Sequence, residues 1–272
     1  AEEVRVGAMV TMAEAARHSE VGERFGAAQD ALLKAASAQL RNAATLGGNL
    51  LQRTRCSYFR DGSSPCNKRQ PGQGCAAQGG DTRGLAILGT SPSCVANYPG
   101  DFAVALVALG ASVTVCDASG AGRTLLVEEL HRTPEDTPHV ETTLAPGELI
   151  TSIHIPKRGW SASAYTKVRD RASYAFALVS AAVALRLDPE TGLIEEAGVA
   201  LGGLAAKPWR CPGVEDALRG ARVSEEHALE AAQACLKDAT LDAHQVFKVE
   251  LGRRTVARAI LEAASRASQD AS

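Results

Sequence analysis

Apolar positions along this chain form short alternating or continuous runs bounded by glycine and proline, which is the pattern of strands. We expect strands over residues 4–10, 112–116, 122–127, 148–155, 162–168, 176–187 and 194–201. Asp117-Ala-Ser-Gly120 predicts a hairpin turn between the second and third of these segments. Segment 175–187 is so rich in alanine that its periodicity also permits a helix.

Helical spacing of apolar residues predicts the remaining elements. Thr11 is placed to cap a first helix, and a second is expected over about 20–39. Pro99-Gly100-Asp101 predicts the start of a helix that ends at Gly110. Further helices are expected near the carboxyl terminus, over 214–218, 224–238 and 246–265. Segregated strands and helices of this kind indicate an α+β fold.

Residues 50–98 show little periodicity and contain many glycines and prolines. A loop of about 50 residues is uncommon inside a compact domain, so something must order it. Four cysteines lie in this segment with the spacing C-x9-C-x8-C-x18-C, namely Cys56, Cys66, Cys75 and Cys94. The C-x2-C pair of zinc ribbons is absent, whereas wide spacing suits an iron–sulfur cluster wrapped by long loops. Zinc binding and four unrelated thiols are the alternatives.

The cysteine segment is also basic. It contains six cations and two carboxylates, namely Arg53, Arg55, Arg60, Lys68, Arg69 and Arg83 against Asp61 and Asp81. Cations near a negatively charged cluster would stabilise its reduced form and raise its potential. A solvated loop, or a docking patch for an acidic electron carrier, would explain the same charges.

Thr45-Leu46-Gly47-Gly48-Asn49 directly precedes the cysteine segment. Glycine permits unusual backbone angles and leaves space beside the chain, so this turn predicts backbone N–H groups that face a phosphate or a flavin. Structural glycines at a helix end are the alternative. The dinucleotide fingerprint G-x-G-x-x-G is absent, which excludes an argument for a Rossmann fold.

Composition narrows the function classes. The 272 residues suggest one large domain or two ordinary ones, and a formal net charge of −2 with 4% aromatic residues gives no indication of nucleic acid or an anionic membrane as partner. No apolar run is long enough to predict a transmembrane helix, and no signal peptide is evident. The sequence does not decide the compartment, which is either the cytoplasm or the periplasm. The periplasm would be reached by export together with a partner subunit.

The remaining cysteines and the histidines predict no further site. Seven cysteines in a chain of this length do not suggest a disulfide framework, so Cys116, Cys211 and Cys235 are expected to be isolated thiols. The six histidines are scattered and form no metal-binding or triad pattern, which favours surface or capping roles. No catalytic residue is predicted.

Four sequence blocks in order resemble one family. They are Arg41-Asn-Ala-Ala-Thr-Leu-Gly-Gly-Asn-Leu50, Tyr98-Pro-Gly-Asp-Phe-Ala103, Ala164-Tyr-Thr-Lys-Val-Arg169, and Ala200-Leu-Gly-Gly-Leu204 with Lys207-Pro-Trp-Arg210. Together they resemble the FAD-binding medium subunit of the molybdenum hydroxylases, the xanthine dehydrogenase and carbon monoxide dehydrogenase family. The cysteine segment resembles the branch with an additional [4Fe-4S] cluster, which includes periplasmic aldehyde oxidoreductases and 4-hydroxybenzoyl-CoA reductase.

The resemblance implies a fold and a set of cofactor contacts. It implies the second half of a two-part, PCMH-like FAD-binding domain over 1–158, with a cluster-binding insert at about 50–98, and a smaller α+β domain of antiparallel sheet and helices over 159–272. Family members begin with a further glycine-rich subdomain, whereas this chain opens at the strand after it, so the isolated chain is not expected to retain flavin. The implied FAD contacts are Thr45, Leu46, Gly47, Gly48, Asn49, Asp101 and Lys167, and the implied cluster ligands are Cys56, Cys66, Cys75 and Cys94.

The implied function is electron transfer within a heterotrimer. Substrate chemistry, aldehyde to carboxylic acid, would take place at a molybdopterin-binding large subunit, and electrons would pass through a [2Fe-2S] small subunit to FAD on this chain and then to ferredoxin, a quinone or oxygen. The alternatives are a zinc-binding assembly subunit without redox function, a free-standing flavoprotein reductase, and the flavin subunit of a 4-hydroxybenzoyl-CoA reductase-like enzyme.

Overall fold

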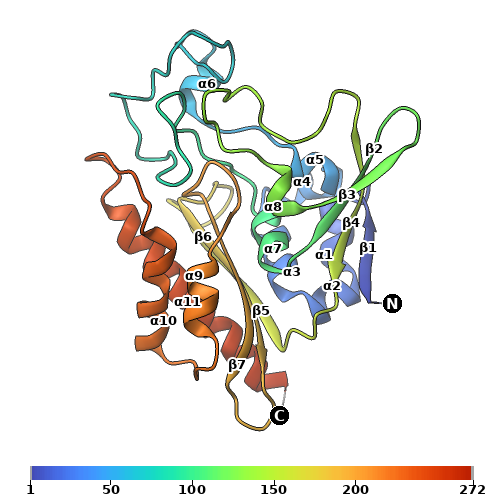
Figure 1. Ribbon diagram of the computed structural model, residues 1–272. Coiled ribbons are helices and arrows are strands. Elements are labelled where there is room, and N and C mark those ends of the chain that lie inside the picture. The colour runs from blue at the N-terminus through green and yellow to red at the C-terminus, as the bar shows by residue number, and fades with distance from the viewer. Residues whose placement is uncertain (1, 271–272) are drawn as a thin grey trace.

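The computed structural model describes residues 2–270, which form two four-stranded antiparallel sheets with helices around them (Figure 1). The first sheet has the order β1-β4-β2-β3, with strands β1 (Glu3–Gly7), β2 (Ser112–Cys116), β3 (Gly122–Leu126) and β4 (Leu149–Pro156). The second has the order β5-β6-β7-β8, with strands β5 (Ala162–Val168), β6 (Val179–Leu187), β7 (Ile194–Gly202) and β8 (Trp209–Arg210). This arrangement confirms the predicted α+β class.

The helices fall into two groups along the chain. The first comprises α1 (Met12–Arg17), α2 (Ser19–Arg24), α3 (Gly26–Lys34), α4 (Ala38–Ala43), α5 (Leu46–Leu50), α6 (Ser57–Asp61), α7 (Phe102–Ala108) and α8 (Val127–Leu130). The second comprises α9 (Pro212–Leu218), α10 (Glu225–Ala231), a 3-10 helix (Ala232–Leu236) and α11 (Phe247–Asp270). Among residues 2–270, no helix combines the length and apolar character that crossing a bilayer requires.

The predicted single helix over 20–39 is wrong, because the chain bends twice within it. Phe25 leaves helical geometry between α2 and α3, and Ala36 adopts a left-handed φ of 49° between α3 and α4. The first bend lets α3 approach the second sheet closely, since a Cβ at Gly26 would lie 2.8 Å from the Ser163 carbonyl oxygen. The Ala27 amide then donates to the Ser163 hydroxyl at 3.0 Å. Tertiary docking therefore overrides the local helical pattern.

The second sheet lies between two helical layers. Helices α3 and α7 pack on one face and α11 packs on the other. Strand β6 supplies both cores, because Ala182 and Ala184 belong to the core with α3 and α7, whereas Ala181 and Val183 belong to the core with α11. A strand buried on both faces has no polar side, which is why its sequence could not be distinguished from a helix.

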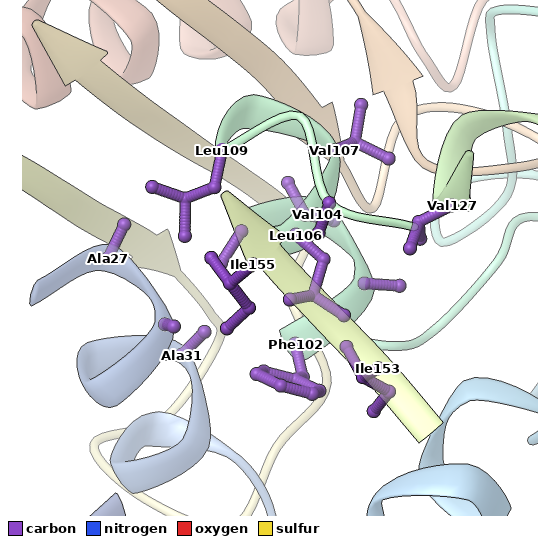
Figure 2. Close-up of a cluster of buried hydrophobic side chains, with 14 of the residues drawn as sticks. Ala27, Ala31, Phe102, Val104, Leu106, Val107, Leu109, Val127, Ile153 and Ile155 are labelled. Atoms are coloured by element: carbon purple, nitrogen blue, oxygen red, sulfur yellow. The ribbon is translucent and has the colours of Figure 1, made fainter. Parts of the chain in front are cut away.

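The first core is formed in part by α3, α7 and β4, which pack together. Figure 2 shows Ala27 and Ala31 of α3 beside Phe102 of α7 and Ile155 of β4. Each of these side chains is at most 2% exposed. Full burial of a large apolar side chain contributes roughly 1.5–3 kcal/mol, so this cluster is a principal source of stability.

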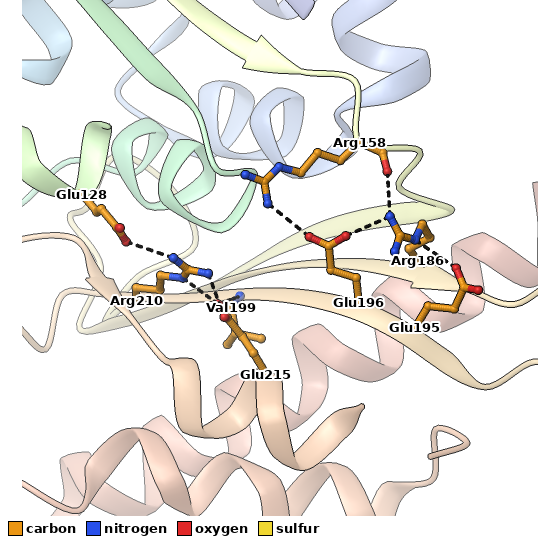
Figure 3. A network of polar contacts seen from close by, with 8 residues as sticks. All are labelled: Glu128, Arg158, Arg186, Glu195, Glu196, Val199, Arg210 and Glu215. Atoms are coloured by element: carbon orange, nitrogen blue, oxygen red, sulfur yellow. Dashed lines mark hydrogen bonds and ion pairs between the residues drawn. The ribbon is translucent and has the colours of Figure 1, made fainter. Parts of the chain in front are cut away.

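Ion pairs also link the two halves of the chain (Figure 3). Arg158 pairs with Glu196 of β7 at 3.1 Å, and Arg210 of β8 pairs with Glu128 of α8 at 3.6 Å. Glu215 accepts from the buried Val199 amide at 3.0 Å. Partly exposed pairs are worth at most about 1 kcal/mol each, so they orient the halves more than they stabilise them.

Cys211 and Cys235 form a disulfide, which corrects the prediction that both are isolated thiols. Their Cα atoms lie 5.2 Å apart, because the start of α9 packs against the 3-10 helix. The two cysteines are 24 residues apart, and closing a loop of that length stabilises the fold by roughly 3 kcal/mol in the chain-entropy account. Cys116 is free and half-buried.

Candidate functional site

The Thr45–Asn49 segment is the cap and first turn of α5, so its two glycines lie at a helix end. Thr45 caps the helix, and its hydroxyl accepts from the Gly48 amide at 3.2 Å. The Leu46 and Gly47 amides donate to the carbonyl oxygens of Val10 and Ala8, each at 2.9 Å. These N–H groups are therefore satisfied within the protein. The prediction that they are free to bind an anion is wrong.

The two glycines serve close approach. Gly47 is buried, and a Cβ there would lie 3.0 Å from the Cβ of Ala8 and 3.3 Å from its carbonyl oxygen. Gly48 is exposed, and a Cβ there would meet only the Thr45 hydroxyl, at 3.1 Å. Neither has a left-handed φ. The absence of a side chain at Gly47 thus lets the turn pack closely on the segment after β1. The absence of a side chain at Gly48 leaves the backbone accessible on the outer face of α5.

Two side chains hold the carboxyl end of α5. The Leu50 carbonyl oxygen accepts from the Tyr98 hydroxyl at 2.9 Å and faces His131 Nε2 at 2.8 Å, and the two rings lie 4.4 Å apart. His131 is only 6% exposed, which corrects its predicted surface or capping role. A lone histidine carries no sequence pattern that could have revealed this. Burial lowers the pKa of His131 to about 4, so the ring is neutral and Nε2 carries the proton.

Two buried acceptor atoms near α5 have no hydrogen-bond partner among the described residues. They are His131 Nδ1 and Asn49 Oδ1. The Asn49 amide nitrogen approaches only the Met12 sulfur, at 3.5 Å. Buried polar atoms are normally paired, so unpaired acceptors indicate a missing donor from a water or a bound molecule. FAD carries hydroxyl and ring N–H donors, so these residues fit it.

A cavity of about 440 Å³ opens beside the same helix end, between Leu50, the cysteine segment and the connection from α8 to β4. Tyr98, His131 and Leu144 line it together with three cations, Arg53, Lys68 and Arg132. Its single lining carboxylate, Glu141, pairs with Arg53 and Lys68. The volume lies in the range of cofactor pockets, and the excess of cations suits an anionic group.

Asp101 and Lys167 form a buried ion pair of 2.8 Å, with side chains 5% and 2% exposed. The second carboxylate oxygen of Asp101 accepts from the Tyr165 hydroxyl at 2.5 Å, and Lys167 also donates to the Lys34 carbonyl oxygen. Burial raises the pKa of Asp101, which the Lys167 ammonium opposes. Both carboxylate oxygens are occupied by protein. The pair ties the start of α7 to β5, and its predicted contact with FAD stays a prediction.

The cysteine segment folds at one end of the molecule (Figure 1, cyan). Cys56 and Cys94 lie in a small core that Cys75 packs against, and Cys66 forms an antiparallel bridge with Cys75. Burial raises the pKa of Cys94 to about 11 and also raises that of Cys56, and each of these thiols interacts electrostatically with Cys66 and Cys75. Within residues 2–270, however, no three His, Cys, Asp or Glu side chains are grouped so that they could hold a metal ion. The predicted metal site is therefore not confirmed.

Some neighbours of these thiols oppose the effect of burial, although on balance the pKa of both Cys56 and Cys94 stays raised. Backbone N–H groups of Tyr58 and Phe59 donate to Cys56, and that of Ala96 donates to Cys94. The Lys68 ammonium acts on Cys94 in the same direction. Such donors stabilise negative sulfur and tune iron–sulfur clusters, so the residues present fit a cluster.

The neutral state of His131 predicts a loss of stability in acid. Its pKa is about 4 in the folded protein against an ordinary 6.5, so the unfolded chain binds the extra proton between these values. Its contribution is full above pH 6.5 and is lost as the pH falls toward 4. We expect the free energy of unfolding to fall by about 2 kcal/mol more in the wild type than in His131→Gln between about pH 7 and about pH 5. Denaturant titrations at both pH values measure this, and equal losses would contradict it.

Comparison with known proteins agrees with this layout. Residues 1–158 match the family described as the FAD binding domain in molybdopterin dehydrogenase, and residues 163–263 match the CO dehydrogenase flavoprotein C-terminal domain. The chain is 42% identical over 265 residues to the aldehyde oxidoreductase FAD-binding subunit PaoB of Escherichia coli, which covers 97% of this chain and 79% of that protein. It is 31% identical over 173 residues to the nicotine 6-hydroxylase medium subunit of Paenarthrobacter nicotinovorans, which covers 61% of this chain and 57% of that protein.

Solved structures share the fold. Quinoline 2-oxidoreductase from Pseudomonas putida 86 superposes with a TM-score of 0.70 at 22% identity, over 98% of this chain and 76% of that one. Carbon monoxide dehydrogenase from Hydrogenophaga pseudoflava gives 0.70 at 19% identity, again over 98% and 76%. Because two family regions match in order and PaoB is similar over nearly the whole chain, the protein belongs to the FAD-binding medium subunits of the molybdopterin dehydrogenase family.

Proposed function

We propose that this chain is the electron-transferring FAD subunit of a heterotrimeric molybdenum hydroxylase that oxidises aldehydes to carboxylic acids. The observation that carries the proposal is the 42% identity with PaoB over 97% of the chain. The proposed partners are a molybdopterin-binding large subunit, a [2Fe-2S] small subunit and an external electron acceptor. FAD supplies the step between one-electron and two-electron chemistry, and the residues of this chain bind, orient and shield it.

The proposed FAD contacts lie along the bare face of α5 and the adjoining cavity. Gly48 leaves room for close approach, and Asn49 offers its unpaired Oδ1. Leu46 and Gly47 are fully enclosed, so they shape the turn from behind, and Thr45 fixes it as the cap. Asp101 and Lys167 would act in the same indirect way, by fixing the start of α7 beside α5.

We further propose that Cys56, Cys66, Cys75 and Cys94 hold a [4Fe-4S] cluster. Their shared region and the N–H donors to sulfur support this. A single zinc ion would need four sulfurs about 2.3 Å from one point, whereas a cluster keeps them apart on separate irons and needs no such compact group.

We also propose that the chain consists of two domains, residues 1–158 and 159–272, since each part has its own sheet. The disulfide favours an oxidising compartment such as the periplasm.

Gly48→Val in the co-expressed, assembled enzyme tests the FAD site. We expect the FAD content to fall roughly tenfold or more, because the valine side chain projects into the space that the cofactor would need, while iron is retained. Valine is not a poorer helix former than glycine, so α5 itself should persist. Absorbance and FAD released by denaturation give the stoichiometry.

Gly84→Val is the matched control, since Gly84 is exposed with open space around its Cα. It should keep both FAD and iron. Full FAD occupancy in Gly48→Val would disprove close approach at α5, and an assembled wild type without FAD would disprove the proposed function.

A further inference from the structure

Three strongly exposed aromatic side chains gather on one surface beside the cysteine segment. Tyr174, Phe176 and Phe247 are 57%, 48% and 39% exposed, and in the described part of the chain no other phenylalanine, tyrosine or tryptophan is so exposed. Each has a guanidinium over its ring. We call these six residues the arginine–aromatic surface, with ring distances of 5.0 Å for Arg55–Phe176, 5.3 Å for Arg83–Phe247 and 5.7 Å for Arg171–Tyr174.

Three separate segments build this surface. Arg55 and Arg83 belong to the cysteine segment, Arg171 to Phe176 form the connection from β5 to β6, and Phe247 begins α11. Arg83 binds both carboxylate oxygens of Asp170, at 2.8 and 3.1 Å, which joins the first two segments. The stacking of Arg55 on Phe176 joins the same two segments. The surface is therefore continuous.

Apart from Arg83, which pairs with Asp170, the positive charges of this surface are not compensated locally. Arg55, Arg171 and the neighbouring Arg60 form no ion pair with a carboxylate among residues 2–270. The whole chain has a net charge of −2, so the local excess does not follow from composition.

This combination fits a protein partner rather than solvent. Aromatic side chains and arginine are the residue types enriched at binding hot spots, and stacked guanidinium groups lose little freedom on binding. Unpaired cations complement a negative patch and increase the rate of encounter. The position next to Cys56 gives a partner a short path to the proposed cluster.

We propose that the arginine–aromatic surface docks an acidic one-electron carrier protein that removes electrons from the enzyme. The proposal rests on the proposed function. Oxidation of an aldehyde with water gives the acid, two protons and two electrons, so two carrier molecules would each leave with one electron. The carrier must be small and acidic, and it must present a one-electron centre near its surface.

The test uses the assembled enzyme with Arg55→Glu/Arg171→Glu, and with Arg171→Glu alone, which lies outside the cysteine segment. The probes are a small acidic [2Fe-2S] ferredoxin and neutral benzoquinone as electron acceptors. We expect kcat/KM for the ferredoxin to fall roughly tenfold or more in the double variant and less in the single one, with benzoquinone rates unchanged. Raising the ionic strength from about 0.05 M to about 0.5 M should slow ferredoxin reduction by the wild type more than by the variants.

Arg219→Glu/Arg222→Glu is the matched control, because both arginines are exposed and lie near the opposite end of β6. It should reduce ferredoxin at the wild-type rate. The proposal is overturned if ferredoxin reduction slows equally in the control and in the surface variants, or if the wild type reduces benzoquinone but not ferredoxin. It is also overturned if Arg171→Glu dissociates the subunits, because the surface would then lie between subunits of the enzyme. If the wild type oxidises no aldehyde, whether ferredoxin or benzoquinone is the acceptor, the proposed function itself is refuted.

Discussion

Replacing Cys66 by serine is expected to strip iron from the assembled enzyme and to release residues 50–98 from their folded state. Cys66 is 8% exposed, and the buried core around these cysteines is small, with partly buried residues packed against it: Cys56, Ala77, Leu85, Cys94 and Ala96 are buried, and Tyr58, Phe59, Cys75 and Val95 are partly buried. Ordering each residue costs about 1–2 kcal/mol of backbone entropy, and few residues between positions 51 and 86 bury a large apolar side chain in return. Metal binding and local folding would therefore be lost together. Iron and acid-labile sulfide analysis, with limited proteolysis of the segment, measures both effects.

Cys116→Ser provides the comparison, since Cys116 is a free, half-buried thiol on β2 outside the segment. It should retain full iron and resist proteolysis. Unchanged iron in Cys66→Ser would count decisively against the proposed ligand set. Loss of iron without increased proteolysis would show that protein contacts alone hold the loop, and that the cluster serves electron transfer only.

Gly198→Ala is expected to cause the largest loss of stability of any small substitution in the sheet. A Cβ at Gly198 of β7 would lie 1.9 Å from the carbonyl oxygen of Ala108 and 3.0 Å from its carbonyl carbon. Both obstacles are backbone atoms at the end of α7, so relief requires helix and sheet to separate. Overpacking of this kind costs about 3 kcal/mol or more, which corresponds to a Tm lower by roughly 6–12 °C. Thermal unfolding followed by circular dichroism measures the change.

Gly84→Ala is the control for this substitution, because a Cβ there meets nothing within 4 Å. Its Tm should stay within about a degree of the wild type, as is usual for exposed sites. A Gly198→Ala protein with an unaltered Tm would mean that α7 and β7 are not held at the observed distance.

Elements with one buried face could be predicted from the sequence. The β2–β3 hairpin matches its predicted turn, because the alternation in β2 and the turn residues are local signals. Strand β5 also matches its predicted range, although both of its faces are buried. Strand β6 remained ambiguous because both of its faces are buried. The helix over 20–39 failed because docking of Gly26 on Ser163 is a long-range contact that no window of sequence contains.

The site shows the same limit. The position of the Thr45–Asn49 turn was evident from its residues, but its amides are occupied by the segment after β1, which only the fold brings near. His131 gave no signal, since its role depends on Leu50, far away in sequence. The Cys211–Cys235 disulfide was missed for a related reason, because helix packing and not spacing brings the two sulfurs together.

The strand shared between both cores makes the two halves of the chain depend on each other. One face of β6 is covered by the amino-terminal half and the other by α11. Separating the halves would therefore expose the alanine-lined face of β6 unless another structure covered it. Cutting the chain near residue 158 would leave an aggregation-prone sheet, not two working modules. We therefore expect neither half to fold stably when it is expressed without the other.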